Sequence, residues 1–449
     1  MPAISLRDTL SGEVKALEPR EPGKVGIYAC GPTTYGRIHI GNARPYVIFT
    51  LLKRFLEHEG LEAKLVINVT DINDKIYAAA AEQAVPSTEW AERMSAAYRE
   101  DTDRLGIGRP DSEPLASETI GEIVGLIEAL IDGGHAYRAN GDVYFRVRSF
   151  PRYGKLSNRD PDQMDQGEEA GSEGLKEDPL DFALWKGRKE GEDSAWPSPW
   201  GEGRPGWHIE CSAMAEKELG PDFAIHGGGS DLIFPHHENE LAQSEAARGL
   251  PLARIWMHNG MIQLDAEKMS KSVGNIFQLS EALDSYGPEA VVAYLGSGHY
   301  RQPLAFSDEL LEEAKARVEG IRNYLRDAPA GDPDPFLRER REEFLAALAD
   351  DFNTPKAYAA LAEIVTEGNR RELPGARAAL EELLPLLGLD ALLAGDEEVD
   401  PEAEALLAER QEARAAGDYP RADEIRDGLA ELGWEVRDEA GGARLVRKR

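Results

Sequence analysis

Hydrophobic and polar positions in the first part of the chain follow two patterns, short apolar runs and apolar residues at helical spacing. Residues 25–29 and 64–69 form mostly apolar runs, and each run predicts a short buried strand. Between the two runs, apolar side chains recur three and four residues apart, which predicts a helix through Ile48, Leu51, Leu52, Phe55 and Leu56. Strands and helices that alternate in this way up to about residue 120 predict a parallel, doubly wound sheet.

The middle of the chain has a different pattern. Residues 161–192 are rich in Gly, Asp and Glu and poor in large apolar side chains. This composition predicts a looped insertion within the sheet domain. Strands and turns are expected from there to about residue 272.

From residue 307 to about residue 393 the spacing is helical and predicts a helical bundle. Phe344, Leu345 and Leu348 fall on one face, and residues 351–355 have the polar and proline pattern of a helix start. Residues 395–398 read as a linker. Two amphipathic helices are expected over residues 402–432, divided near residues 417–420, followed by a strand at 434–436 and a turn at 441–442.

Composition places these elements in a protein without membrane spans. The chain has 449 residues, of which 41% are hydrophobic, and no apolar stretch approaches the length needed to cross a bilayer. The N-terminus lacks the basic and then apolar pattern of an export signal, and only two cysteines are present, which excludes a disulfide framework. We therefore expect a cytoplasmic protein.

The formal net charge of −32 bears on possible partners. A polyanion repels nucleic acid, so any binding of RNA must depend on local basic patches and weaken as the salt concentration rises. The candidate basic positions are Arg370, Arg371, Arg444, Arg447, Lys448 and Arg449. Solvated surface charge is the alternative interpretation of these residues.

Two segments have the features of a polyphosphate site. Residues 30–42 are rich in Gly and Pro and join the first predicted strand to the first predicted helix, so their backbone N–H groups and the helix dipole suit a phosphate. Far downstream, Lys268 and Lys271 stand three residues apart in a Lys/Ser pentad. Paired ammonium groups could clamp a polyphosphate. A tight connection and a solvated surface segment are the respective alternatives.

Both cysteines lie in motifs that also suggest a metal site. Cys30 begins the strand-to-helix segment, and Cys211 lies about two dozen residues before a His/Glu-rich segment that begins with Pro235. If Pro235 occupies the first turn of a helix, His236 and Glu240 lie on one face and could complete a tetrahedral zinc site with two thiolates. His237 with Glu240 is a competing pair, and core thiols without a metal are a third possibility.

Several blocks together resemble the cysteinyl-tRNA synthetases, a family of class I aminoacyl-tRNA synthetases. They are residues 30–35 with His39-Ile40-Gly41-Asn42, Asn68-Val69-Thr70-Asp71, residues 206–214, residues 226–232, residues 235–240 and the pentad Lys268-Met269-Ser270-Lys271-Ser272. Two of these blocks correspond to the signature motifs of class I aminoacyl-tRNA synthetases. His39–Asn42 stands at the position of the HIGH box, and the pentad is the KMSKS box. The resemblance extends along nearly the whole chain.

The resemblance implies a set of ligands and roles. Its zinc ligands fall on Cys30, Cys211, His236 and Glu240, with one zinc ion per subunit. Its catalytic positions fall on His39, Asn42, Lys268 and Lys271, and the nucleotide, bound with Mg²⁺, would also contact Gly227, Gly228, Gly229 and Asp231. Thr70 and Trp207 would line the amino-acid pocket.

The implied reaction joins L-cysteine to tRNA(Cys) in two steps. ATP first activates the carboxylate as cysteinyl-adenylate with release of pyrophosphate, and a ribose hydroxyl of the terminal adenosine then takes up the cysteine. A hydrocarbon pocket distinguishes near-isosteres by only about 1–3 kcal/mol. A zinc ion that binds the substrate thiolate would therefore select cysteine against serine.

Two positions depart from the pattern that the family leads us to expect. Asn42 replaces the second histidine of the HIGH box, so it can donate a hydrogen bond but cannot carry a positive charge. Asn73 stands where an acidic residue is expected, and the sequence offers no reason for it.

The pattern and the resemblance together give the expected architecture. We expect an α/β fold with a Rossmann-like parallel-sheet catalytic domain over residues 1–120 and 206–300, interrupted by an inserted connective subdomain at 121–205. A helical bundle at 301–394 and a small α/β anticodon-recognition domain at 400–449 would follow, in a monomer. Two relatives remain as alternatives, the cysteine ligase of mycothiol synthesis, which acts on an amino sugar, and a non-catalytic RNA-binding paralogue. The C-terminal segment 422–434 favours tRNA as the acceptor, and His39 and Lys271 argue against the paralogue.

Overall fold

A computed structural model describes residues 3–164, 175–264, 277–394, 401–439 and 442–447. The chain forms two compact units, Met1–Leu389 and Asp390–Arg449. Among the described residues, no helix is long and apolar enough to cross a membrane.

A four-stranded parallel sheet is the centre of the first unit. Its strands are β3 (Lys24–Ala29), β4 (Glu62–Ile67), β9 (Phe223–Gly229) and β10 (Ala253–Asn259), in the order β10-β9-β3-β4. The strands at 25–29 and 64–69 and the parallel sheet are thus confirmed. A short antiparallel hairpin of β1 (Ser5–Asp8) and β2 (Glu13–Ala16) contacts β10.

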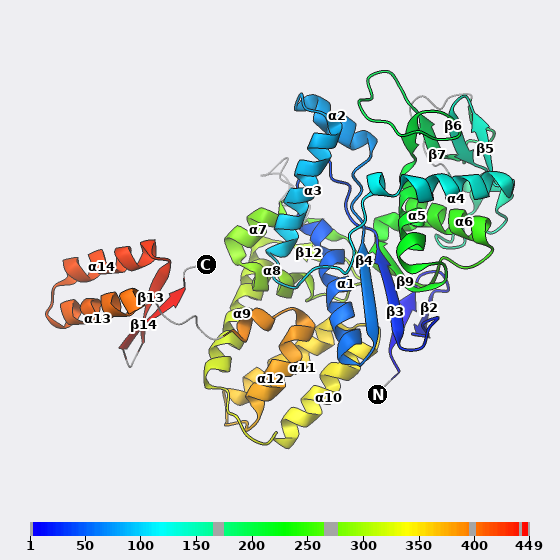
Figure 1. Ribbon diagram of the computed structural model, residues 1–449. Helices are drawn as coiled ribbons and strands as arrows, with labels where there is room; N and C mark the ends of the chain where they lie inside the picture. The colour runs from blue at the N-terminus through cyan, green and yellow to red at the C-terminus, as the bar shows by residue number, and fades with distance from the viewer. Residues whose placement is uncertain (1–2, 165–174, 265–276, 395–400, 440–441, 448–449) are drawn as a thin grey trace. The chain divides into compact units, whose positions relative to one another are not determined.

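Helices lie on both faces of this sheet (Figure 1). Helix α1 (Ile40–His58), which confirms the predicted helix, contacts β3, β4 and β9. Phe49 of α1 lies directly over Gly227, where a Cβ would be only 2.0 Å from the ring. Helix α5 (Trp207–Leu219) lies on the other face, where its Leu219 covers Gly26 of β3, and it packs beside α6 (Glu238–Arg248).

Between β4 and α5 the chain leaves the sheet. It forms α2 (Asp74–Glu82), α3 (Ser87–Asp103) and α4 (Ile120–Asp132), and then an antiparallel sheet of β5 (Ala136–Ala139), β6 (Asp142–Phe145), β7 (Phe182–Gly187) and β8 (Gly203–Pro205). The prediction of a looped insertion over 161–192 was therefore wrong for β7. The four residues Phe182 to Trp185 are all buried, and averaging over the polar residues around them concealed this short run.

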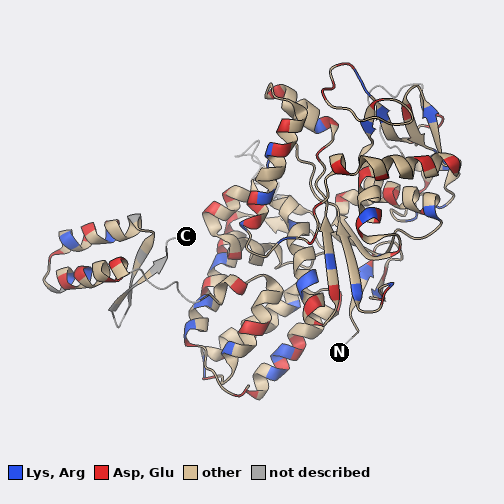
Figure 2. Cartoon of the chain, viewed as in Figure 1, with Lys and Arg blue, Asp and Glu red and all other residues tan. Residues whose placement is uncertain are grey.

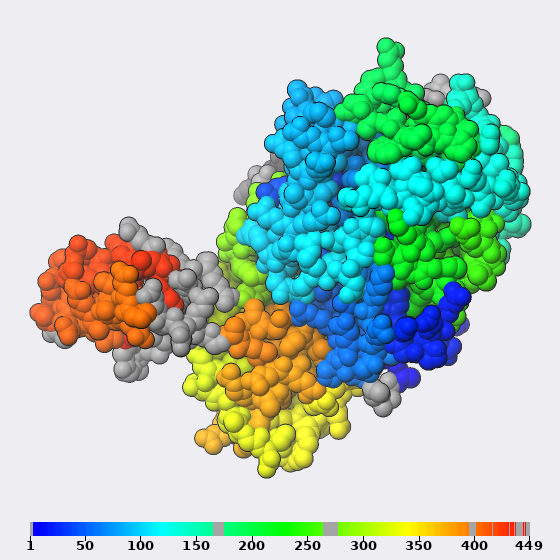
Figure 3. All heavy atoms as spheres, in the orientation of Figure 1, coloured from blue at the N-terminus to red at the C-terminus, as the bar shows by residue number. Residues whose placement is uncertain are grey.

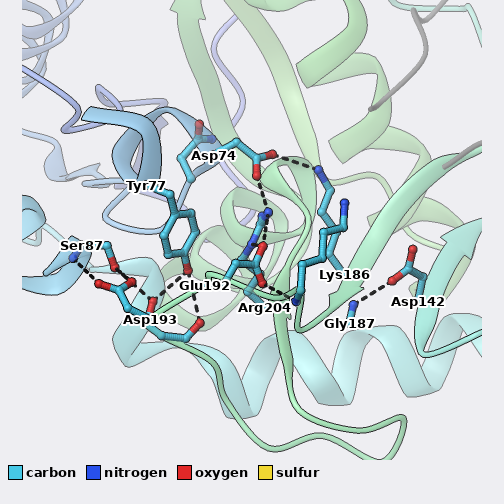
Figure 4. A network of polar contacts seen from close by, with 12 residues as sticks. Asp74, Tyr77, Ser87, Asp142, Lys186, Gly187, Glu192, Asp193 and Arg204 are labelled. Atoms are coloured by element: carbon cyan, nitrogen blue, oxygen red, sulfur yellow. Dashed lines mark hydrogen bonds and ion pairs between the residues drawn. The ribbon is translucent and has the colours of Figure 1, made fainter. Parts of the chain in front are cut away.

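Polar contacts join the α2–α3 pair to the segment between β7 and β8 (Figure 4). Arg204, which is almost fully buried, forms ion pairs with Asp74 and with Glu192, the latter at 3.1 Å. Asp193 accepts a hydrogen bond of 2.7 Å from the backbone N–H of Ser87 at the start of α3. These contacts fix the inserted strands relative to the helices that follow β4.

Past β10 the chain forms β11 (Ile262–Leu264), α7 (Leu279–Tyr286), α8 (Pro288–Leu295) and β12 (Leu304–Phe306), which pairs with β11 in parallel. The predicted bundle then follows as α9 (Asp308–Asp327), α10 (Pro335–Ala349), α11 (Thr354–Gly368) and α12 (Ala376–Leu383). The helix start at 351–355 is confirmed, because the Asn353 side chain caps α11 by accepting from the N–H of Lys356. The bundle borders the N-terminal part of the chain (Figure 3), and Arg54 of α1 donates to the carbonyl of Pro385.

The second unit contains α13 (Pro401–Ala415), α14 (Tyr419–Glu431) and the antiparallel pair β13 (Trp434–Glu439) and β14 (Gly442–Arg447). The two predicted amphipathic helices and the strand after them are confirmed. Ile425, Leu429, Trp434 and Leu445 form its own small core. Acidic and basic residues are interspersed along both helices (Figure 2), while the predicted linker at 395–398, Gly441, Lys448 and Arg449 lie outside the described residues.

Candidate active site and metal centre

A cleft of about 310 Å³ opens at the carboxyl ends of β3, β9 and β10. This is the edge at which parallel α/β sheets bind ligands. One wall is the start of α1 with the residues before it, and the other is the end of β9 and the exit of β10. Of the site residues predicted from the sequence, Cys30, His39, Asn42, Trp207, Gly229 and Asp231 line the cleft.

His39 and Asn42 build the start of α1. His39 is the N-cap residue, and its Nδ1 accepts a hydrogen bond of 3.1 Å from the N–H of Gly41. Asn42 completes a capping box, because its Oδ1 accepts from the His39 N–H at 3.2 Å. With Nδ1 accepting, a neutral His39 carries its proton on Nε2 and can donate it to a ligand.

Electrostatics keep His39 neutral at physiological pH. Burial lowers the pKa of His39, and the attraction of Asp231 only partly opposes this shift. The amide NH₂ of Asn42 remains a donor after its oxygen is used in the cap. The start of α1 thus presents neutral donors and a helix N-terminus, a combination that suits phosphate oxygens.

The three consecutive glycines end strand β9. Gly227 and Gly228 leave no room for side chains, since a Cβ would meet Phe49 and His237 respectively. Gly229 lines the cleft together with Asp231, which follows in a short turn. The bare backbone of this strand end lets a ligand approach closely.

Cys30, Cys211, His236 and Glu240, here called the four-donor cluster, are buried and offer ligand atoms that lie within 4.8 Å of one another. The Cys30 Sγ lies 3.4 Å from Glu240 Oε1 and 3.6 Å from His236 Nε2. His236 Nε2 lies 3.0 Å from the same carboxylate oxygen. Two thiols, an imidazole and a carboxylate in one shell form a donor set that zinc accepts.

A second donor set shares two members with the first. Cys30 and Glu240 also lie within 4.8 Å of ligand atoms of His226 and His237. The competing pair of His237 and Glu240 is therefore within reach as well, although His237 Nε2 is 3.8 Å from Glu240 Oε1. The described residues thus contain two overlapping sets of potential metal ligands.

The backbone around His236 is helical apart from one kink at Phe234. Helix α6 begins at Glu238, and residues Ile233–His237 form an irregular turn in which Phe234 is extended, with φ −140° and ψ 134°. Past this kink, the residues from Pro235 to His237 have helical backbone angles and lead directly into α6, which agrees with the predicted helix start at Pro235. His236 and Glu240, four residues apart, therefore meet as the spacing predicted.

The charges of the cluster are strongly coupled. Burial raises the pKa of Cys30, whereas the hydrogen bond from Cys30 lowers that of Cys211 to about 6. Burial alone would lower the pKa of His236, but Glu240 and Cys211 raise it to about 10. Against its own burial, Glu240 is held well below its usual pKa by His226 and His236. The cluster thus holds negative charge ready for a cation.

Four further histidines surround this cluster, and the sequence analysis assigned a possible role only to His237 among them. His226 Nε2 lies 2.9 Å from Glu240 Oε2, and His208 Nδ1 lies 2.9 Å from His236 Nδ1. His237 contacts Cys30 at 3.3 Å and His258 at 2.8 Å. Five of the nine histidines of the chain gather here, and their positions near strand ends or beside Cys211 were the signal available in the sequence.

The remaining predicted residues differ in their placement. Trp207 lines the cleft, is 37% exposed and stacks on the His236 ring with a centroid distance of 4.4 Å. Thr70 is buried, and its hydroxyl accepts a hydrogen bond from Asn68 at 3.2 Å rather than lining the cleft described here. Lys268 and Lys271 lie outside the described residues.

Comparisons with known families agree along the whole chain. The family model described as "tRNA synthetases class I (C) catalytic domain" matches residues 16–316, the "DALR domain" matches 343–390, and the "Cysteinyl-tRNA ligase anticodon binding domain" matches 396–445. Among solved structures, a methionyl-tRNA synthetase of Mycobacterium tuberculosis with methionyl-adenylate shares the fold, with a TM-score of 0.58 at 16% identity over 81% of this chain and 88% of that chain.

Curated relatives are similar at much higher identity. The cysteine–tRNA ligase of Caldicellulosiruptor saccharolyticus is 44% identical, with 99% of this chain and all of the relative covered. Those of Symbiobacterium thermophilum and Halorhodospira halophila are 45% and 46% identical, with at least 99% of each chain covered. With the cluster, the cleft and these full-length matches in agreement, the chain belongs to the cysteinyl-tRNA synthetase family of class I aminoacyl-tRNA synthetases.

Proposed function

We propose that the protein charges tRNA(Cys) with L-cysteine at the expense of ATP. In the first step the cysteine carboxylate attacks the α-phosphorus of ATP, which forms cysteinyl-adenylate and releases pyrophosphate. In the second step a ribose hydroxyl of the terminal adenosine attacks the activated carbonyl, which transfers cysteine and releases AMP. Identities of 44–46% to cysteine–tRNA ligases over nearly the full length support this activity.

One observation carries the assignment of the substrate. Cys30 is both a member of the four-donor cluster and part of the cleft wall, so a ligand in the cleft reaches the cluster directly. His39 and Asn42 line the same cleft from the start of α1. A small molecule with a sulfur at one end and a carboxylate at the other fits between these two groups.

The four donors fit a zinc ion, because zinc accepts thiolate, imidazole and carboxylate ligands. We assign it to Cys30, Cys211, His236 and Glu240 rather than to the overlapping set, since the two thiolates make the first set softer. When bound, the ion supplies a soft Lewis acid that favours a thiolate over an alcohol. Trp207 lines the cleft and stacks on the His236 ring, so it lies between the cleft and one of the proposed ligands.

The start of α1 would hold the phosphates of ATP. The neutral Nε2–H of His39 and the amide of Asn42 would donate to phosphate oxygens, with Mg²⁺ accompanying the nucleotide. Gly227, Gly228, Gly229 and Asp231 would receive the adenosine, and Lys268 and Lys271 would neutralise the β- and γ-phosphates. No side chain needs to act as a strong base, because alignment and charge stabilisation suffice for this displacement.

The oligomeric state and the acceptor complete the proposal. The four donors of one chain suffice for one zinc ion, and we propose a monomer. Both cysteines are free thiols, as the reducing cytoplasm maintains them. The match of residues 396–445 to an anticodon-binding domain favours tRNA over an amino sugar as the acceptor.

The decisive experiment is cysteine-dependent exchange of pyrophosphate into ATP, with serine in parallel, followed by charging of tRNA(Cys). We expect exchange with cysteine, little with serine, and about one zinc per chain by elemental analysis. Transfer of cysteine to an amino sugar but not to tRNA would assign the chain to the other ligase. Absence of exchange would contradict the activity itself.

A Cys211→Ser variant tests the role of the cluster. We expect kcat/KM for cysteine to fall by more than about 100-fold, because loss of a ligand weakens a metal site at least as much as loss of a supporting residue. The affinity for ATP, measured by equilibrium binding, should stay within about 2-fold, since Cys211 does not line the cleft. Equal losses for both substrates would contradict the assigned role.

A further inference from the structure

Arg44 is a buried cation in the second turn of α1. Only 1% of its surface is exposed, and no carboxylate forms an ion pair with it among the described residues. Burial lowers the pKa of its guanidinium to about 10, so it stays charged at neutral pH. A buried charge without a counterion costs more than an apolar side chain of similar volume would. Packing alone therefore does not account for an arginine here.

Three backbone carbonyls accept hydrogen bonds from this guanidinium, whereas its Nε has no partner among the described residues. Nη1 donates to the carbonyls of Gly260 at 2.5 Å and Gln302 at 2.8 Å, and Nη2 donates to that of His299 at 3.1 Å. The three carbonyls converge from two segments that are about 40 residues apart in sequence. The planar fork of an arginine can reach them together, whereas a lysine amine is a single point donor.

The first of these segments forms the opposite wall of the cleft, and the second packs against it. Asn259, Gly260 and Met261 line the cleft at the exit of β10, facing His39 and Asn42. Residues 299–302 lead into β12, which pairs with β11 directly after Met261. Arg44, two residues beyond Asn42, thus connects the α1 wall of the cleft to the β10 wall.

Gly260 shows how tightly this junction is packed. A Cβ on Gly260 would lie 2.3 Å from the carbonyl carbon and oxygen of Gln302, a distance that real structures do not tolerate. The Gly260 N–H also donates to the Tyr300 carbonyl at 2.7 Å. The backbone of β10 and the segment before β12 are therefore locked together, and the guanidinium ties this pair to α1.

We propose that Arg44 is a positioning residue for cysteine activation, which holds the exit of β10 against the start of α1 so that both walls grip the nucleotide in one alignment. This inference rests on the proposed function, because it assigns Arg44 to the first step of that reaction. Displacement at phosphorus needs close alignment, and a misplacement of about 1 Å can cost about 100-fold in rate. Arg44 touches no substrate and acts through the walls.

The test compares Arg44→Met and Arg44→Lys with Arg54→Met. Arg54 lies on the same helix and also donates to carbonyls, those of Ile107 and Pro385, but it lies outside the cleft. For both Arg44 variants we expect kcat of cysteine-dependent pyrophosphate exchange to fall by about 100-fold. Arg54→Met should keep the kcat of the wild type at temperatures below its own melting point.

A second measurement separates alignment from folding. Cobalt exchanged into the metal site reports cysteine binding by its thiolate charge-transfer absorption, and this titration should be unchanged in the Arg44 variants because Arg44 contacts no member of the cluster. Gly260→Ala displaces the same junction while Arg44 is intact, and it should also reduce kcat of pyrophosphate exchange. If Arg44→Met does not fold, Gly260→Ala and Arg44→Lys provide the test.

The outcomes are distinct. Folded Arg44 variants with a kcat of the wild type, or with cysteine binding weakened as much as kcat, would overturn the positioning role while leaving the proposed function in place. A wild-type protein without cysteine-dependent exchange would overturn both. A lowered kcat with cysteine binding intact, in the Arg44 variants and not in Arg54→Met, is the result we expect.

Discussion

At the scale of single residues, the histidines that contact the four-donor cluster support the proposed metal ligands. Glu240 offers one carboxylate oxygen to the cluster side and the other to His226, at 2.9 Å. His226 itself is buried against Trp256, on whose ring it stacks at 4.4 Å. Supporting residues of this kind orient a metal ligand and raise the affinity of the site.

We therefore expect His226→Gln to weaken zinc binding by about 10–100-fold, because the carboxylate of Glu240 loses its fixed orientation. Competition with a chelator measures this directly. His135→Gln is the matched control, since His135 bonds to Ser149 in the inserted segment and should leave the affinity unchanged. An affinity equal to that of the wild type would argue that Glu240 is oriented by its other contacts.

The donors could be anticipated from the sequence only in part. Cys30 and Cys211 stood out because they are the only cysteines of the chain. The choice between His236 and His237 could not be made, since residues three and four positions before Glu240 both lie on its side of a helix and both reach its carboxylate. The supporting role of His226 depends on a contact between a strand end and a helix, which no local pattern encodes.

At the scale of elements, the structure gives a reason for Asn73. This residue is the N-cap of α2, and its side chain accepts from the N–H of Lys75 at 3.0 Å. Asparagine and aspartate cap helices about equally well. The acidic residue expected at this position and the asparagine that occupies it can therefore perform the same local task.

A pair of variants tests this explanation. Asn73→Ala should lower the free energy of unfolding by about 1 kcal/mol, since a helix N–H loses its partner, whereas Asn73→Asp should leave it within about 0.5 kcal/mol. Urea unfolding followed by circular dichroism measures both. If Asn73→Asp instead destabilised the protein as much as Asn73→Ala, the amide would have a role beyond capping.

Asp8 links the β1–β2 hairpin to the central sheet. Its buried carboxylate accepts hydrogen bonds from Lys15 and from the N–H of Trp256 in β10. Burial on its own would raise the pKa of Asp8, but these hydrogen bonds hold it below its usual value. A carboxyl with a lowered pKa in the folded state stabilises the protein above its unfolded pKa of about 3.9, and this contribution disappears as the pH falls further.

We expect Asp8→Asn to cost about 1–3 kcal/mol of stability at pH 7 and progressively less below about pH 4, because the wild type then loses the same charge. Unfolding free energies of both proteins between pH 3 and pH 7 provide the measurement. A difference that did not change with pH would show that shape, and not charge, accounts for the effect.

Among the elements, those with a clear apolar pattern were predictable, and a strand in polar surroundings was not. The strands β3 and β4 and helix α1 follow directly from apolar periodicity, because each buries a continuous face. Strand β7 is as long as β3 and β4, but it lies between polar segments, so its partners β6 and β8 determine its conformation. The capping box of His39 and Asn42 was likewise hidden, since it depends on backbone directions at the turn.

At the scale of the whole molecule, the division into two units separates two tasks. The cleft and the cluster lie entirely within the first unit, and the second has its own core of Ile425, Leu429, Trp434 and Leu445. The family match over residues 396–445 associates the second unit with the anticodon. Activation and tRNA selection should therefore be separable.

A chain that ends at residue 394 tests this division. We expect it to keep cysteine-dependent pyrophosphate exchange within about 3-fold, because every residue assigned to activation is present. The kcat/KM for tRNA(Cys) should fall by at least about 10-fold, as contacts worth about 1.4 kcal/mol or more are lost. Exchange activity that disappeared with the second unit would show that the two units are coupled.

Both cysteines of the chain belong to the four-donor cluster. Under the proposed function, each new copy of the enzyme is translated with cysteine that earlier copies delivered, and it needs that amino acid at only these two codons. A copy that mistook serine for cysteine would place alcohols at positions 30 and 211 of its successors. Such successors would lack both sulfur donors. Inaccurate enzymes would therefore not be maintained in the cell.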